Sequence, residues 1–107
     1  VAYSNKAKKN ILKIPADIIA QKGAVSPEVA KLLAKSVRLA VKADLGIGIT
    51  GIAGPGGGSK AKPVGTVFIA IDAKNKRICK KLNFTGSRLT IRKKVALKAL
   101  ELLRRLI

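Results

Sequence analysis

The sequence predicts an α/β fold in which a mixed β-sheet is covered by helices. The run VFIAI at residues 67–71 is apolar at every position, which is typical of a central strand buried on both faces. The segments before and after it, from residue 27 and from about residue 90, repeat apolar residues with helical spacing. At 107 residues the chain is expected to form a single domain, residues 1–107, that can bury a core.

The first predicted elements are short. The opening letters VAY suit the end of a strand, and residues 5–12 suit a short helix that begins at Ser4 or Asn5. Pro15 then opens a second short helix over residues 16–22, which Gly23 ends. Because the first residue is Val and not Met, we expect the chain to be a fragment or a shortened form.

A longer helix is expected from Pro27 onward. Ser26 can cap it, proline is favoured at the first helical position, and Glu28 suits the positive end of the helix. One face is apolar and is predicted to be buried: Val29, Leu32, Leu33, Val37, Ala40 and Val41. The opposite side carries a basic stripe: Lys31, Lys35, Arg38 and Lys42.

Strands and a final helix complete the chain. Residues 44–50 (DLGIGIT) indicate a short strand, and residues 63–84 indicate a hairpin that turns at Ala73 to Lys76. The last segment, from about Ser87 or Thr90 to Ile107, predicts a long amphipathic helix. Its apolar positions are Ile91, Val95, Ala99, Leu102, Leu103 and Leu106.

Net charge is the most unusual property of the composition. Lys and Arg number 23 against five acidic residues, which gives a formal charge of +18. Such a field attracts polyanions and phosphorylated ligands, but a lysine-rich surface that only contacts water would give the same number. Nucleic acid bound through the basic surface is therefore an alternative partner, although the aromatic residues that would stack bases are scarce.

The residues present also narrow the cofactors and the compartment. Cys79 is the single cysteine and histidine is absent, which excludes an internal disulfide and the usual zinc sites. We expect no metal and no cofactor. There is no signal-peptide pattern and no apolar run of about 18 residues, so we expect a soluble, cytoplasmic protein without a membrane partner.

Seven of the ten glycines lie in GIGITGIAGPGGG, residues 46–58. The first six letters spell G-x-G-x-x-G, but a dinucleotide fingerprint needs a helix directly after its glycines, and another loop follows here. A Walker A loop is also excluded, because neither Lys60 nor Lys62 follows a glycine. The remaining interpretations are an anion-binding backbone loop and a flexible linker; Ile52, Ala53 and Pro55 favour a fixed shape.

Five segments carry a resemblance to a known family. In order they are VAYSNKAK, GAVSPEVA, ADLGIGITGIAGPGGG, KPVGTVFIA and F-x-G-x-R-x-x-x-R. Together they closely resemble the CinA C-terminal domain family, over essentially the whole chain. That family includes the nicotinamide-nucleotide amidases, which hydrolyse nicotinamide mononucleotide to nicotinate mononucleotide and ammonia. The resemblance implies a CinA C-terminal-domain-like α/β fold and a small phosphorylated ligand, a pyridine mononucleotide.

The resemblance also implies a site. The reaction would be amide hydrolysis by a serine nucleophile with a lysine base, which needs no histidine. Lys8, the base, and Tyr3 would be the catalytic residues, with Asn5 lining the same site. The nucleotide or the oxyanion would be held by a set of loop residues: Thr50, Gly51, Ala53, Gly54, Gly57, Gly65 and Thr66. Arg88 and Arg92 would contact the phosphate, which a guanidinium fork suits.

The sequence departs from the family pattern at several places, among them Lys6, where the family often has glutamate, and LKIP, where it usually has L-G-V. The family's nucleophilic serine lies in an E-S-C-T-G-G stretch upstream of VAYSN, and the 107 residues do not contain it. Ser87 replaces the aspartate common in F-x-G-D-R. Without the first family elements the sheet would expose an edge, associate with another copy as a homo-oligomer, or stand alone after reworking. The function therefore stays open between an amidase domain and a basic polyanion-binding scaffold without catalysis.

Overall fold

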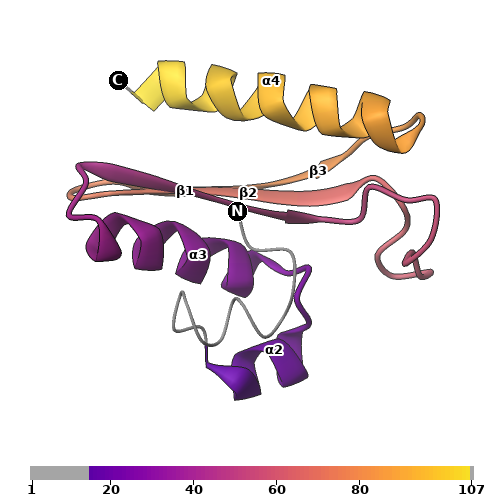
Figure 1. The fold of residues 1–107 in the computed structure, drawn as a ribbon, viewed down its shortest axis with the longest axis horizontal. Coiled ribbons are helices and arrows are strands. Elements are labelled where there is room, and N and C mark those ends of the chain that lie inside the picture. Colours follow the sequence, from indigo (N-terminus) through magenta and orange to yellow (C-terminus); the bar gives the residue numbers. More distant parts are fainter. Residues whose placement is uncertain (1–14, 107) are drawn as a thin grey trace.

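The computed structural model of the chain describes residues 15–106, so the predicted VAY strand and the predicted helix over residues 5–12 lie outside it. The elements in chain order are α2 (Ala16–Lys22), α3 (Pro27–Ala40), β1 (Leu45–Gly51), β2 (Thr66–Ala73), β3 (Arg77–Asn83) and α4 (Arg88–Leu106). They form three layers, with α3 on one face of the sheet and α4 on the other (Figure 1).

The described sheet has the order β1-β2-β3. Both strand pairings are antiparallel, with Ile49 opposite Ile69 and Ala70 opposite Cys79. The hairpin closes where it was predicted, with the Ala73 N–H donating to the Lys76 carbonyl. The predicted α/β class with a helix-covered sheet is confirmed, while the parallel pairing of a mixed sheet does not occur within residues 15–106.

Strand β2 is the centre of the fold, as the VFIAI run predicted. Val67, Ile69 and Ile71 pack towards α4, where Ala99 and Leu102 complete a buried aliphatic cluster. The alternate residues of β2, Phe68 and Ala70, point the other way. They pack on two small side chains of α3, Ala30 and Ala34. Because successive side chains of a strand point to opposite faces, both faces of β2 are buried by different helices.

Helix α3 begins as predicted but turns a different face to the sheet. The Ser26 hydroxyl accepts the Val29 N–H at 3.3 Å and donates to the Gly23 carbonyl at 2.8 Å. The buried residues of the helix are Val29, Ala30, Leu33 and Ala34. The predicted apolar face was wrong at its C-terminal end, where Ala40 is exposed and the Val41 side chain is 67% exposed.

Two glycines of β1 explain this orientation of α3. A Cβ on Gly46 would overlap the Ala34 carbonyl oxygen, and a Cβ on Gly48 would overlap the Ala30 carbonyl oxygen. The helix backbone therefore lies directly against the strand backbone. Only small residues fit at such a contact, so the alanines of α3 face the sheet and its larger residues lie to either side.

The predicted basic stripe on α3 is interrupted at Arg38. Its Nε lies 2.6 Å from Oδ2 of Asp72, while Nε of Arg77 lies 2.8 Å from Oδ1 of the same carboxylate. The Asp72 side chain is only 6% exposed, and a buried carboxylate needs such paired donors. Arg38 is therefore a structural partner of the sheet, whereas Lys31, Lys35 and Lys42 remain exposed.

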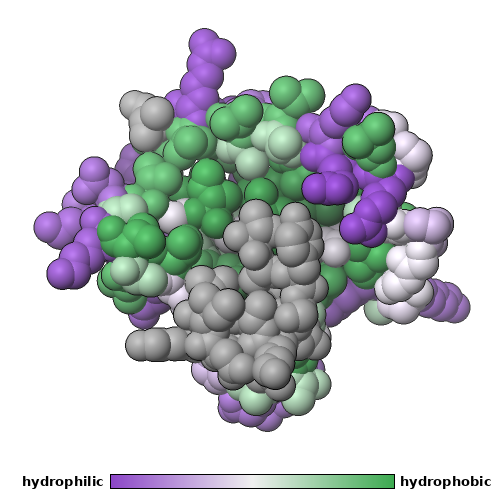
Figure 2. All heavy atoms as spheres, in the orientation of Figure 1, coloured by the Kyte–Doolittle hydropathy of each residue, from purple (hydrophilic) through white to green (hydrophobic). Residues whose placement is uncertain are grey.

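Helix α4 packs through the face that its periodicity predicted. Ile91, Ala99 and Leu102 are buried, whereas Leu97 and Leu100 are 68% and 62% exposed. In the view of Figure 2, apolar side chains gather between the two helical layers and hydrophilic ones project at the margins. None of the helices within residues 15–106 is both long and apolar enough to cross a membrane.

Candidate functional site

The glycine loop, residues 52–65, connects β1 to β2 and is closed at its base by backbone hydrogen bonds. The Ile52 N–H donates to the Thr66 carbonyl at 2.9 Å, and the Gly65 N–H donates to the Ile52 carbonyl at 2.7 Å. The Phe84 N–H donates to the Gly65 carbonyl at 2.9 Å and ties the base to the segment after β3. The base of the loop is therefore an extension of the sheet.

Three of the predicted ligand-binding glycines have a backbone conformation that favours glycine. Gly54, Gly57 and Gly65 have φ of 81°, 88° and 96°, in the left-handed region. A Cβ on Gly65 would also overlap the Phe84 carbonyl oxygen, and a Cβ on Gly54 would lie 2.6 Å from Cγ1 of Val64. These glycines allow the chain to turn sharply while packing against its neighbours.

Lys62 anchors the loop to the helical layer, a role that sequence reasoning missed. Its Nζ donates to the Lys22 carbonyl at 3.0 Å and to the Val25 carbonyl at 2.5 Å, at the turn between α2 and α3. In the sequence Lys62 stands out only as a candidate Walker A lysine, which the preceding Ala61 excludes. The one local signal is its position just before Pro63, where the chain returns to β2. That position does not indicate that its amino group binds the carbonyls of Lys22 and Val25, which are distant in the sequence.

Arg88 comes from the other end of the sequence to the same loop. Its Nη1 donates to the Gly54 carbonyl at 3.1 Å, across 34 positions of the chain. It is the first residue of α4, and Ser87 caps that helix by accepting the Thr90 N–H at 3.2 Å. Arg92 lies one helical turn further along and is exposed.

The apex of the loop is open at Gly56 and Gly57, whereas Gly58 packs against the backbone of Val64. The backbone N–H groups of Gly56, Gly57 and Gly58 donate no hydrogen bond to any group within residues 15–106. A Cβ on Gly56 would meet nothing within 4 Å, and one on Gly57 would meet only Cγ2 of Ile52 at 3.6 Å. Three successive free amides on a loop with a fixed base can surround an anion.

The remaining predicted site residues fall into three groups. Thr50 and Thr66 are buried and use their hydroxyls within the protein: Thr50 donates to the Ala24 carbonyl at 2.6 Å, and Thr66 to Oδ1 of Asn83 at 3.4 Å. Gly51 and Ala53 lie at the start of the loop. Tyr3, Asn5 and Lys8, which include both predicted catalytic residues and one predicted ligand-binding residue, lie outside the described residues.

Arg88 therefore contacts the loop that carries Gly54, Gly57 and Gly65, and the contact of these residues with a ligand stays a prediction. No three His, Cys, Asp or Glu side chains among residues 15–106 are grouped so that they could hold a metal ion. The arrangement offers neutral amide donors and one guanidinium, which suits recognition of an anion.

Comparison with known proteins identifies relatives over the whole chain. The CinA C-terminal domain profile matches residues 1–107. A Moorella thermoacetica protein that carries the competence-damage inducible name is 50% identical over 103 residues, and a CinA-like protein of Citrifermentans bemidjiense is 46% identical over 105. These alignments cover 96% and 98% of this chain but 25% of each relative, so the chain spans about a quarter of their length.

Solved structures agree with the sequence relatives. A competence/damage inducible protein of Agrobacterium tumefaciens superposes with a TM-score of 0.96 at 36% identity, covering 99% of this chain and 66% of that one. A CinA superfamily protein of Escherichia coli superposes with a TM-score of 0.93 at 31% identity, covering 98% of this chain and 61% of that one. The fold that the resemblance implied is therefore confirmed.

Proposed function

The chain belongs to the CinA C-terminal domain family, and from this premise we propose that it binds a pyridine mononucleotide at the glycine loop and takes part in hydrolysis of the nucleotide's carboxamide. Nicotinamide mononucleotide and water would give nicotinate mononucleotide and ammonia. Because the chain spans only part of its relatives, binding is the step for which the described residues offer most support.

One observation carries the proposal: the open amides at the apex of the loop lie on the same loop whose Gly54 carbonyl accepts from Arg88. A phosphate monoester carries up to two negative charges and accepts several hydrogen bonds. Arg88 uses one N–H group on Gly54 and keeps the rest of its fork for the ligand. The overall charge of +18 further favours a phosphorylated ligand over an uncharged one.

The chemical step of the proposal rests on the family resemblance. A serine hydroxyl would attack the carboxamide carbon, and Lys8 would accept the hydroxyl proton and pass it to the departing ammonia. Water would then hydrolyse the acyl-enzyme ester to release nicotinate mononucleotide. The 107 residues hold no E-S-C-T-G-G stretch, so a segment of that kind has to supply the serine.

The binding proposal is tested by calorimetric titration with nicotinamide mononucleotide and with nicotinamide riboside, which lacks the phosphate. We expect saturable binding of the mononucleotide and much weaker binding of the riboside. Arg88→Ala should weaken mononucleotide binding by about tenfold to a hundredfold, because a hydrogen bond to a charged group contributes about 1.5–3 kcal/mol. Arg104→Ala, an exposed control on α4, should bind normally; equal losses in the two variants would refute the site.

The catalytic proposal is tested by measuring ammonia released from nicotinamide mononucleotide by the chain and by Lys8→Ala, each joined to a segment that carries the E-S-C-T-G-G serine. If Lys8 is the base, the variant should release ammonia at least about a hundredfold more slowly, the usual contribution of general acid–base catalysis. Equal rates above the buffer blank would eliminate Lys8. A rate equal to the blank for the joined chain with Lys8 intact would limit this chain to binding.

A further inference from the structure

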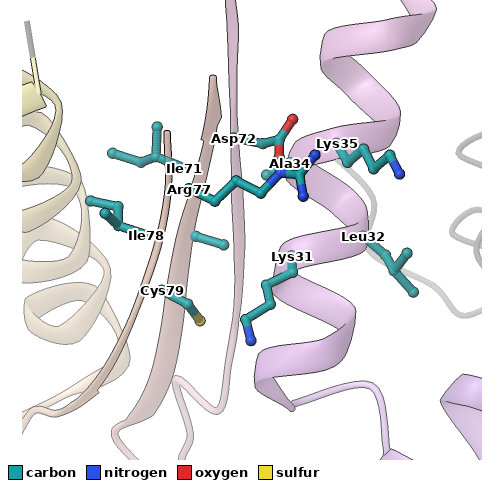
Figure 3. A pocket seen from close by; sticks show the side chains of 10 residues that line it. Lys31, Leu32, Ala34, Lys35, Ile71, Asp72, Arg77, Ile78 and Cys79 are labelled. Carbon is teal, nitrogen blue, oxygen red and sulfur yellow. Dashed lines mark ion pairs between the residues drawn. The ribbon is translucent and has the colours of Figure 1, made fainter. Parts of the chain in front are cut away.

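A cavity of about 510 Å³ lies on the α3 side of the sheet, away from the glycine loop, and we refer to it as the α3–β3 recess. Lys31 and Lys35 line it from α3, and Asp72, Arg77 and Cys79 line it from the sheet. Figure 3 shows Lys31 and Cys79 directed into the space between α3 and the strands, whereas Lys35 projects from the helix away from the strands.

The recess exists because β3 extends beyond the cover of α3. Helix α3 packs closely over β1 and β2, as the Gly46 and Gly48 contacts require. Register places Arg77 opposite Asp72, Cys79 opposite Ala70, and Lys81 opposite Phe68, so the side chains of this row of β3 point to the α3 face. Cys79 is only partly buried, and Arg77 and Lys81 are exposed.

The walls of the recess carry an excess of positive charge. Lys31 and Lys35 lie one helical turn apart, which is about 6 Å along the axis of α3. Arg77 and Lys81 lie four residues apart on β3, or about 13 Å. Asp72 is shared between Arg77 and Arg38, so one carboxylate faces two guanidinium groups.

Glu28 lies one helical turn before Lys31 and is the remaining acidic group close enough to act on the Cys79 thiol. Burial raises the pKa of that thiol, Lys31 lowers it, and Glu28 raises it. Three cations therefore line the recess: Lys31 and Lys35 from α3, and Arg77 from β3. Lys81 continues the row of β3 beyond the lining residues, on the same face of the sheet. The acidic group that lines the recess, Asp72, is already paired with two arginines.

We propose that the α3–β3 recess is a groove for the phosphodiester backbone of a single-stranded nucleic acid. Two parallel rows of cations on a concave surface suit one extended chain of phosphates. A duplex would meet the recess only with its outer surface, because it is too broad to enter a cavity of this size. The described part of the chain places no exposed aromatic ring beside the recess, so binding should be independent of base sequence.

The first test compares two charge-matched triple variants. The recess variant is Lys31→Gln, Lys35→Gln and Lys81→Gln, and the control is Lys74→Gln, Lys80→Gln and Lys93→Gln, which removes three exposed cations elsewhere. Anisotropy of a fluorescein-labelled 15-nucleotide oligothymidine is followed at several salt concentrations. The recess variant should bind at least about tenfold more weakly, and the slope of log K against log salt should fall by about 2, which is three phosphates at about 0.7 each.

The outcomes separate the proposal from its alternatives. The control variant should lose less than about threefold, the share due to net charge alone. Equal losses in the two variants would overturn the groove, since only the overall field would then act. Duplex DNA or polyglutamate that competes as well as unlabelled oligothymidine at equal charge concentration would overturn the single-stranded assignment, in favour of a duplex or an acidic protein.

Cys79 supplies a second, independent readout because it is the single cysteine and lies in the recess. Labelling of the unmodified chain with N-ethylmaleimide, an uncharged reagent, is timed at constant pH with and without saturating oligothymidine. A bound strand should slow labelling several-fold, by covering the thiol and by opposing its ionisation. Nicotinamide mononucleotide should leave the rate unchanged if it binds at the glycine loop. Unchanged labelling in the presence of bound oligothymidine would overturn the proposal.

Discussion

Strand β1 and the glycine loop that follows it contain the same residue for opposite reasons. At Gly46 and Gly48 the missing side chain leaves room that the backbone of α3 fills completely. At Gly56 and Gly57 the missing side chain leaves open space and unused amide donors, although the φ of 88° at Gly57 also favours glycine. The first pair positions a helix, and the second pair leaves room for a ligand.

This difference explains why the letters G-I-G-I-T-G mislead when they are read as a phosphate motif. Gly46 and Gly48 lie inside a strand and belong to packing, as the sequence context indicated. The anion-binding proposal concerns the later glycines, from Gly54 to Gly58, which follow the end of the strand. Substitutions at the two kinds of glycine should therefore have separable effects on stability and on binding.

Gly48→Ala should have the largest effect on stability. The new Cβ would meet the Ala30 carbonyl oxygen and would lie 2.7 Å from the Ala34 backbone nitrogen, and helix backbone atoms cannot move independently. Overpacking of this kind costs about 3 kcal/mol or more. Urea unfolding followed by circular dichroism measures it; a loss below about 1 kcal/mol would show that α3 is not seated on the strand.

Gly65→Ala should rank second and acts at the base of the loop. Alanine disfavours the φ of 96°, and its Cβ would overlap the Phe84 carbonyl oxygen, whose loop segment can shift more easily than a helix. We expect a loss of about 2 kcal/mol in unfolding free energy. The same urea titration provides the measurement, and a stability equal to that of the unmodified chain would mean that the base of the loop is loose.

Arg88→Ala should affect stability less than binding. The hydrogen bond to the Gly54 carbonyl is partly buried and contributes about 1 kcal/mol. Arg88→Lys is the informative partner, because it keeps the charge and loses the planar fork. If mononucleotide affinity in Arg88→Lys equals that of the unmodified chain, charge alone is sufficient and the fork has no role.

Gly56→Ala should leave stability within about 0.5 kcal/mol of the unmodified chain. Its Cβ would meet nothing within 4 Å, and its φ is not in the left-handed region. Thermal unfolding of this variant beside Gly48→Ala compares the two kinds of glycine directly. A shift of several degrees in Gly56→Ala would show that the apex is packed, contrary to the proposed open site.

Local elements could be predicted from the sequence because their signals are local. The helix over residues 16–22 with its stop at Gly23, the Ser26 cap, and the turn after Ala73 all depend on neighbouring residues. The buried run of β2 was also readable, since a strand covered on both faces must be apolar throughout.

Contacts between distant segments could not be predicted. The face of α3 was misassigned at its C-terminal end because helical periodicity does not reveal that Gly46 and Gly48 demand small partners. The Arg38–Asp72 pair and the Lys62 anchor join residues 34 and 37 positions apart, respectively. The resemblance named Arg88, but its contact with the Gly54 carbonyl needed the three-dimensional arrangement.

The measurement that most directly tests the central claim is an amide-resolved NMR titration of the chain with nicotinamide mononucleotide. If the apex of the glycine loop holds the phosphate, the amide signals of Gly56, Gly57 and Gly58 should shift saturably, with one shared dissociation constant. The signals of Gly46 and Gly48 should stay in place because α3 covers them. Unmoved apex signals at a concentration that saturates binding elsewhere would contradict the account.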